Sequence, residues 1–488
     1  MTSQVRGGLL PYKPDPRIKP IARYMGASGG AVTGAALAPP ASIDWYSKIT
    51  DWPLYNNGVL NDCVPAAFAH AIEQQTFYAG KPVVPTEEDV EAFYAVASAD
   101  PKWTPGSSDG GIGCVMTTAL ADWFASGIGG DKPIGYASVN WRDPAEFQQA
   151  IALFGSVIVG LALPLTAQTQ FGAGTPWDIS FTGNSTIGSW FYHCVLVVGY
   201  DAATGLYTVV TWGRTQQMTQ TFISWYMYEA HTVISRDFIG SNGISPSGLN
   251  LGALTVDMMD PIDREVHALY VALYGRAADG FGVSFWQSAV GARDPNYTIE
   301  YVWSDLSVAD QIWLGQQFVS TQSTYFNARY GALDDQTFVQ SLYMNIGGNT
   351  GDAGGAAYWV GLLTAAKAAG QSSTDARAGI IGQFAHDMLN IDLTPGAAAF
   401  GLSAADYAAA VTRQQQFQNK VAVSQFYTQQ SQLPNGGVLA VTSTSDQSFA
   451  ASQHIVATVT ADPATLAAAE TAVAVAVAAN SLTPILNS

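Results

Sequence analysis

Between residues 41 and 240, apolar positions recur first at helical spacing and then at strand spacing. The stretch 85–98 (PTEEDVEAFYAVAS) has one apolar face and opens with a Thr-x-x-Asp capping-box pattern, which predicts the start of a helix. Two further helices are predicted at 114–127 and 143–155 because each pattern ends at a glycine, and the second begins with Asp-Pro.

The strand patterns come later in the same region. Residues 156–164 (SVIVGLALP) form a continuous apolar run, which predicts a buried strand. The runs 193–201 and 205–213 are joined by DAATG, a hairpin signal. Helices followed by strands within one domain predict an α+β fold.

Beyond residue 255 the pattern is helical and contains an internal repeat. Residues 269–286 (LYVALYGRAADGFGVSFW) align with 342–359 (LYMNIGGNTGDAGGAAYW) at an offset of 73, with six identities. Each copy predicts a helix, a Gly/Asp turn and a helix that carries a tryptophan, Trp286 or Trp359. Asp279 and Asp352 are expected to cap the second helices; a calcium site is the alternative, but one carboxylate per loop supplies too few ligands.

These patterns give four segments. Residues 1–40, rich in Pro and Gly, are predicted to be an extended arm, and 41–240 the α+β domain. Residues 241–254 are a predicted linker, and 255–488 a mainly α-helical repeat domain. A chain of 488 residues is too long for one core, which agrees with two or three domains.

Charge and composition narrow the classes of partner and the location that we expect for this protein. The net charge of −18 disfavours nucleic acid and anionic membranes as partners. The acidic, lysine-poor balance suits an exported or virion-associated protein. No apolar N-terminal signal precedes residue 20, so we expect any export to use a route without a cleaved N-terminal signal. The alanine-rich tail LAAAETAVAVAVAAN is too short for a membrane span, and nothing in the sequence calls for a cofactor or a metal.

Cys63 is the candidate nucleophile among three cysteines, whose odd number argues against a disulfide scaffold. It precedes an Ala-rich helical run, with Pro65 tolerable in the first turn and Asn61 or Asp62 able to cap. A helix N-terminus favours a thiolate. Asn57, six residues earlier, is the candidate oxyanion donor beside the Cys63 backbone N–H.

This region resembles the papain-like cysteine peptidases. Their nucleophile segment Gln-Gly-x-Cys-Gly-x-Cys-Trp-Ala-Phe is similar to NGVLNDCVPAAF, and their His-Ala-Val-x-x-x-Gly-Tyr strand is similar to HCVLVVGY, which begins at His193. The family's Asn-Ser-Trp-Gly is similar to VTWG, which includes Trp212. LPYKPDPR, NDC and TWG are closer still to a papain-like group of bacteria and their phages. The resemblance covers about residues 8–238 and implies a Cys63 nucleophile, a His193 base and Trp212 in the substrate cleft, packed over His193.

Three positions depart from that pattern. Asn57 replaces a glutamine, and Val210 stands where the family has the asparagine that orients the histidine; Thr208, Thr211 or a residue from another segment could substitute for it. Asp62 beside the nucleophile opposes thiolate formation.

His70 lies about 10.5 Å along the helix from Cys63, too far to act as the base, and is expected to have a packing role. Cys114 and Cys194 are expected to be core thiols.

Residues 263–479 resemble an uncharacterised bacterial domain family of exported and surface-layer-like proteins, sometimes described as phycobilisome-linker-like. Its motif Leu-Tyr-x4-Gly-Arg-x2-Asp-x2-Gly-x3-Trp fits the first copy of the repeat, whereas Arg276 becomes Asn349 in the second. The resemblance implies a binding, attachment or assembly module.

Two functions follow from these observations. The first is a thiol hydrolase, a papain-like cysteine peptidase acting on a protein or peptide with a degraded third position at Val210. The alternative is a catalytically impaired papain-like scaffold with a cell-surface or virion assembly partner, favoured by Val210 and by the bulky Phe-Tyr before His193. The size of the cleft at Cys63 discriminates between the two.

Overall fold

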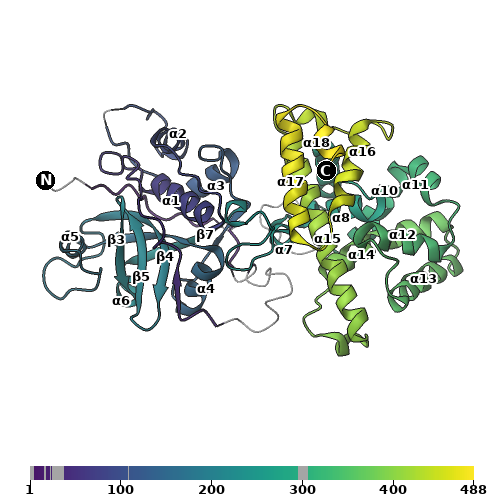
Figure 1. The fold of residues 1–488 in the computed structure, drawn as a ribbon, viewed down its shortest axis with the longest axis horizontal. Helices are drawn as coiled ribbons and strands as arrows, with labels where there is room; N and C mark the ends of the chain where they lie inside the picture. Colours follow the sequence, from purple (N-terminus) through teal and green to yellow (C-terminus); the bar gives the residue numbers. More distant parts are fainter. Residues whose placement is uncertain (1–4, 16–17, 22–23, 25–37, 108, 295–305) are drawn as a thin grey trace. The chain divides into compact units, whose positions relative to one another are not determined.

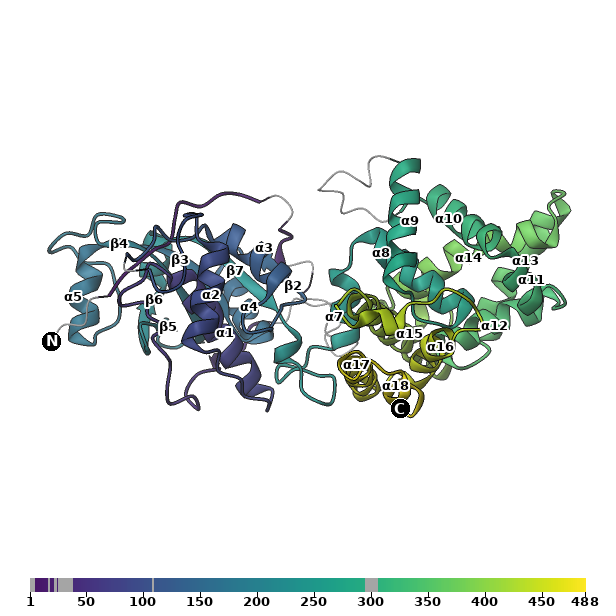
Figure 2. The same ribbon diagram turned by 90° about the horizontal axis from the view of Figure 1, so that it is seen from above.

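The protein is described here by a computed structural model, which covers residues 5–15, 18–21, 24, 38–107, 109–294 and 306–488. The chain forms two compact units, each with its own core (Figures 1 and 2). The first unit contains the described residues up to 24, then 38–240 and 244–249, and the second contains 241–243 and 250–488. The first is mixed α and β with an antiparallel sheet, and the second is helical.

The sheet of the first unit has the strand order β2-β7-β3-β4-β5-β6, and β1 pairs with β4. All of these pairs are antiparallel. The elements of the unit are β1 Ser42–Asp44, α1 Cys63–Tyr78, α2 Glu87–Ala97, α3 Met116–Ser126, β2 Gly135–Ser138, α4 Pro144–Phe154, β3 Val157–Leu163, α5 Leu165–Ala173, β4 Phe191–Asp201, β5 Leu206–Thr211, β6 Arg214–Thr219, α6 Gln220–Tyr226, β7 Met227–Ile234 and η2 Arg236–Phe238.

The helix and strand predictions of this unit are confirmed. Helix α2 has a complete capping box between Thr86 and Asp89, and α4 begins after its N-cap Asp143 and ends at Gly155. Every residue of β3 is buried, and β4 and β5 form the predicted hairpin.

Helix α1 packs against β4 and β5 and joins them in one core cluster. Cys194 and Leu196, which alternate along β4, point into that cluster. Helix α4 packs on β3, β4 and β7, and Phe147 of α4 contacts Tyr207 of β5. The start of α1 and the start of β4, which carry Cys63 and His193, are therefore held by a rigid buried core.

Helix α15 is the longest element of the second unit, and it packs against helices from both ends of that unit's sequence, including α7, α12 and α17. The elements are α7 Leu251–Met258, α8 Pro261–Leu269, η3 Tyr270–Tyr274, α9 Gly280–Arg293, α10 Val308–Thr321, α11 Ser323–Tyr330, α12 Asp335–Gly347, α13 Ala353–Ala368, α14 Ser373–Asn390, η5 Ala397–Phe400, α15 Ala404–Ser431, η6 Gly436–Leu439, α16 Gln447–Thr458, α17 Pro463–Ala478 and α18 Thr483–Leu486.

The predicted linker 241–254 ends too late. Helix α7 begins at Leu251, inside that segment, because Asn250 caps it with hydrogen bonds from two backbone N–H groups. The helix packs on α15, so residues 251–254 belong to the helical unit. Its Leu, Gly and Ala residues gave no clear helical period in so short a stretch.

The two repeat copies have the predicted turn chemistry. Gly275 and Gly348 adopt left-handed backbone, with φ of 61° and 64°. Asp279 accepts a hydrogen bond from the Gly282 N–H at the start of α9, and Asp352 does the same for Gly355 in α13. The capping role predicted for both aspartates is confirmed.

Candidate active site

Cys63 is the first residue of α1, and its thiol lies among backbone N–H groups. Burial raises the pKa of this thiol well above its usual value. The Cys194 N–H opposes that effect by hydrogen bonding to the sulfur, as do the N–H groups of Cys63 and Val64, whereas the Asp62 carboxylate adds to it. Cys63 is only 1% exposed, so the thiol is neutral in this closed state.

His193 is held by two residues from the end of β5. Its Nε2 lies 2.7 Å from Thr211 Oγ1. The Trp212 ring stacks on the imidazole with 4.1 Å between centroids and an 11° interplanar angle, so the predicted packing of Trp212 over His193 is confirmed. His193 Nδ1 is buried and has no hydrogen-bond partner among the described residues. Burial lowers the pKa of His193 to about 3, so the ring is neutral.

A tight turn brings Thr211 and Trp212 to the imidazole. Trp212 and Gly213 both have positive φ, 45° and 74°, and they join β5 to β6 as a two-residue hairpin loop. A tryptophan in this conformation is strained, and the strain is offset by its stacking on His193. Of the two threonines considered as substitutes for Val210, Thr211 makes the contact. Val210 points into the core shared with α1.

Cys63 and His193 line one void of about 10 Å³. The side chains of Asn57, His70 and Thr211 border the same void. A space of this size is at the lower limit for a single water molecule and is too small for a peptide substrate. The site is therefore closed in this structure.

The Asn57 amide is directed at Asp62. Its Nδ2 lies 2.9 Å from Asp62 Oδ1, and both side chains are buried. Burial raises the pKa of Asp62 to about 7, and the hydrogen bond from Asn57 works in the opposite direction. The amide has to turn away from Asp62 before it can stabilise an oxyanion.

Side-chain capping of α1 by Asn61 or Asp62 is not formed. Asp62 occupies the N-cap position, but its backbone (φ −103°, ψ 24°) departs from the extended form typical of capping residues, and its side chain makes no cap bond. Asn61 Nδ2 instead donates to the Gly111 carbonyl oxygen at 2.5 Å.

The packing role predicted for His70 is confirmed. His70 Nε2 lies 2.8 Å from the Pro53 carbonyl oxygen, and the ring packs edge-on against Trp52. Burial lowers the pKa of His70 to about 4. With Nε2 occupied by a backbone carbonyl, His70 borders the void as a neutral packing residue.

Residues 6–10 of the N-terminal arm lie across the candidate site, which the sequence did not predict. The Arg6 N–H donates to the Asn57 carbonyl oxygen at 3.2 Å, and the Trp212 Nε1–H donates to the Arg6 carbonyl oxygen at 3.0 Å. Further along the arm, Leu9 is buried and pairs with Cys114 in a parallel bridge. The arm therefore bonds to both walls of the site.

Two consecutive glycines allow this close approach. A Cβ on Gly7 would overlap the Tyr192 carbonyl oxygen, and a Cβ on Gly8 would overlap that of Asn61. Gly8 has a φ of +126°, a conformation that favours glycine, and its carbonyl oxygen accepts a hydrogen bond from the Cys114 N–H at 2.9 Å. The Gly-Gly-Leu-Leu pattern of the arm was the available signal.

Two comparisons with known proteins match part of the chain. A family model described as a domain of unknown function (DUF4214) matches residues 316–371, which contain the second copy of the repeat. Among solved structures, xylellain, a cysteine protease from Xylella fastidiosa, matches 48% of this chain and 97% of its own, with 12% identity and a TM-score of 0.37. No curated protein sequence matches the chain significantly. Among helices of the described residues, none combines the length and apolar character needed to cross a bilayer.

Proposed function

We propose that the first unit is a papain-like thiol hydrolase, a cysteine peptidase with Cys63 as nucleophile and His193 as base. The observation that carries the proposal is the environment of His193. Thr211 binds one ring nitrogen and Trp212 fixes the ring plane, while the other nitrogen lacks a partner among the described residues. The imidazole borders the same void as a cysteine at a helix N-terminus. Nucleophile, base and orienting group form this kind of triad.

The reaction is acyl transfer from a peptide to Cys63 and then to water. With the His193 proton on Nε2 and donated to Thr211, Nδ1 is free to take the thiol proton while sulfur attacks the carbonyl carbon. The Cys63 backbone N–H stabilises the oxyanion, joined by Asn57 once it leaves Asp62. Imidazolium returns the proton to the leaving amine, and a water deprotonated by His193 hydrolyses the thioester.

The arm makes this hydrolase latent. Residues 6–10 bond to Asn57, Cys114 and Trp212, and in this proposal they occupy the path by which a substrate would reach Cys63. When the arm is displaced, water reaches the site, so the Cys63 pKa falls and the His193 pKa rises toward their ordinary values. Displacement of the arm is therefore the activating step.

Gly8→Val tests the proposal because its side chain cannot fit beside Asn61. Gly130→Val is the matched control, since Gly130 also has positive φ but an added Cβ meets nothing within 4 Å. We expect iodoacetamide at pH 6 to label Cys63 of Gly8→Val selectively over Cys114 and Cys194, measured by peptide mass, and a fluorogenic peptide library to be cleaved. Adding His193→Ala should remove both effects.

The second candidate is a papain-like scaffold that serves surface attachment or virion assembly. The closed void and the raised Cys63 pKa favour it. If Gly8→Val exposes Cys63 to a neutral alkylating reagent at pH 9 but gives neither selective labelling at pH 6 nor peptide cleavage, the hydrolase proposal is wrong and the scaffold remains.

A further inference from the structure

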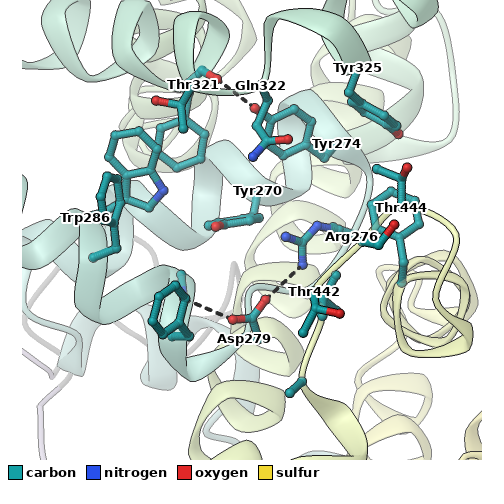
Figure 3. A pocket seen from close by; sticks show the side chains of 18 residues that line it. Tyr270, Tyr274, Arg276, Asp279, Trp286, Thr321, Gln322, Tyr325, Thr442 and Thr444 are labelled. Carbon is teal, nitrogen blue, oxygen red and sulfur yellow. Dashed lines mark hydrogen bonds and ion pairs between the residues drawn. The ribbon is translucent and has the colours of Figure 1, made fainter.

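The second unit contains an aromatic cavity of about 660 Å³ that the candidate hydrolase site does not use (Figure 3). Its walls come from η3, α9, α10, α11, α16 and the loop before α16. Aromatic rings make up much of its lining, together with short polar side chains, and one of the rings, Phe281, is 84% exposed. A concave aromatic site with few polar groups is typical of small-ligand binding.

Three polar side chains meet at one wall of this first cavity. The Arg276 guanidinium lies over the Tyr270 ring, 4.5 Å from its centroid, and Arg276 Nη1 is 3.6 Å from Asp279 Oδ2. Figure 3 shows the Arg276 guanidinium and the Asp279 carboxylate turned toward each other, with the Tyr270 ring beside them. Arginine and aspartate are both largely buried and neutralise each other, so the wall offers donors and acceptors side by side without net charge.

A second cavity, of about 470 Å³, contains the repeat equivalents of these residues. Tyr343, Asp352 and Trp359 stand 73 positions after Tyr270, Asp279 and Trp286. Phe384 contacts Trp359 and Tyr343, and Phe318 contacts Trp286 and Tyr270, although Phe318 stacks on its tryptophan and Phe384 meets its tryptophan edge-on. Tyr358, 59% exposed, lines this cavity in the position equivalent to Phe285.

The arginine of the second cavity comes from elsewhere in the chain. Asn349 occupies the position equivalent to Arg276, yet Arg413 of α15 places its guanidinium 4.9 Å from the Tyr343 centroid and Nη1 3.5 Å from Asp352 Oδ2. The two wall geometries agree within about half an ångström. Each aspartate already caps a helix through a backbone N–H, so the cap alone does not require a guanidinium.

Arg413 also carries a donor that the protein leaves unused. Its Nε is buried and has no hydrogen-bond partner in the described part of the chain, although the residue is only 6% exposed. A buried donor without a partner costs about 1–3 kcal/mol. A ligand hydroxyl in the cavity removes that cost only when the Arg413 side chain moves to bring Nε to the cavity surface.

The chemistry of these walls selects a neutral, polyhydroxylated ring. A vicinal pair of hydroxyls both donates and accepts hydrogen bonds, as the Arg–Asp pair requires, and the C–H face of a pyranose packs on aromatic rings. Aspartate and the net charge of −18 oppose a phosphate or sulfate ligand. A lipid chain would bury the Arg–Asp pair without a polar partner.

We propose that the second unit binds neutral hexopyranose units in these two cavities, so that one chain has two saccharide sites. This role is independent of the hydrolase proposal. The saccharide proposal gives both copies of the repeat the same binding chemistry. A polysaccharide contains many identical rings, so one polysaccharide chain can occupy both sites.

The test is calorimetric titration of the full chain with cellohexaose, maltohexaose, chitohexaose and mannohexaose at millimolar concentration. We expect at least one hexaose to bind at two sites per chain and to change tryptophan fluorescence. Phe281→Ala or Tyr358→Ala should each remove one site, and the double variant both. Phe181→Ala, a change of a 95% exposed phenylalanine in the first unit, should leave two sites.

Arg276→Lys adds a test of the polar wall, since lysine keeps the charge but loses the planar fork. It should weaken the first site at least about tenfold, while the melting temperature changes little. The proposal is overturned if no neutral hexaose binds, if binding survives in the double variant, or if only a heparin hexasaccharide or N-acetyltryptophanamide binds.

Discussion

Thr211 is the residue on which the orientation of His193 depends. A hydroxyl that accepts the Nε2–H stabilises the imidazolium formed when Cys63 loses its proton. A hydrogen bond to a charged group contributes about 1.5–3 kcal/mol, or roughly tenfold to hundredfold in rate. In the Gly8→Val background, Thr211→Val should slow Cys63 alkylation at pH 6 by this factor.

Thr211→Ser keeps the hydroxyl and should restore most of the rate, whereas a merely structural role of Thr211 predicts that serine and valine behave alike. The pH profile gives a second readout, because loss of the acceptor lowers the His193 pKa and moves the acid limb of alkylation to lower pH. An unchanged profile would contradict the assignment.

Asp62 makes stability depend on pH in a defined direction. Its pKa is raised from 3.8 to about 7 by burial, so the folded state holds the proton more tightly than the unfolded chain does. This contribution to stability is fully present below about pH 4 and is lost as pH rises to 7. Asp62→Asn does not titrate, so its stability relative to wild type should grow across that window by a few kcal/mol, at about 1.4 kcal/mol per pKa unit.

Urea dependence of hydrogen exchange in peptides from α1 measures this difference at pH 4, 6 and 8. A constant difference between Asp62→Asn and wild type across pH would show that Asp62 is ionised and solvated in the folded protein.

At the scale of elements, the sequence predicted most of what short-range chemistry determines. The capping box of α2, the Asp-Pro start of α4 and the two Asp caps of the repeat are local patterns, and each formed. The arm across the site depends on contacts more than 50 residues apart, such as Arg6 with Asn57 and Trp212. No local periodicity encodes such contacts, so the sequence indicated only an extended segment.

The same limit explains Thr211 and Arg413. The sequence left Thr208, Thr211 and a residue from another segment open, and the strained turn at Trp212 brings Thr211 to His193. Arg413 lies 64 positions after Asn349, so the repeat alignment shows an arginine lost, whereas the fold shows it replaced. In both cases tertiary packing, and not the distance in sequence, determines which side chain makes the contact.

The tryptophans of the repeat test the equivalence of its two copies. Trp286 is 4% exposed and Trp359 2% exposed, and each packs on a phenylalanine, Phe318 or Phe384. Replacing either with alanine should cost about 3–5 kcal/mol through cavity formation, measured by urea unfolding of the helical signal. Phe285→Ala, at a half-exposed neighbour of Trp286, should change stability by less than about 0.5 kcal/mol. A small cost at one tryptophan only would show that the copies pack differently.

At the scale of the whole molecule, the two units have separate cores and separate candidate chemistry. The Cys63 void lies within the first unit, and both aromatic cavities lie within the second. Trp286→Ala should therefore leave Cys63 labelling in the Gly8→Val background unchanged. A change in labelling would indicate energetic coupling between the units.

Residues 250–488 should fold when expressed alone, because helix α15 packs against helices drawn from the start, middle and end of this segment. The stability of the fragment depends on its first residue. Asn250 caps α7 and accepts a hydrogen bond from Gln415 of α15 at 3.2 Å, and α7 buries most of its residues. A fragment 250–488 should show cooperative urea unfolding by circular dichroism, and a fragment 259–488, which lacks α7, should unfold at lower urea. If 250–488 is unfolded while the full chain is folded, the two units share a core and the helical unit is not an independent module.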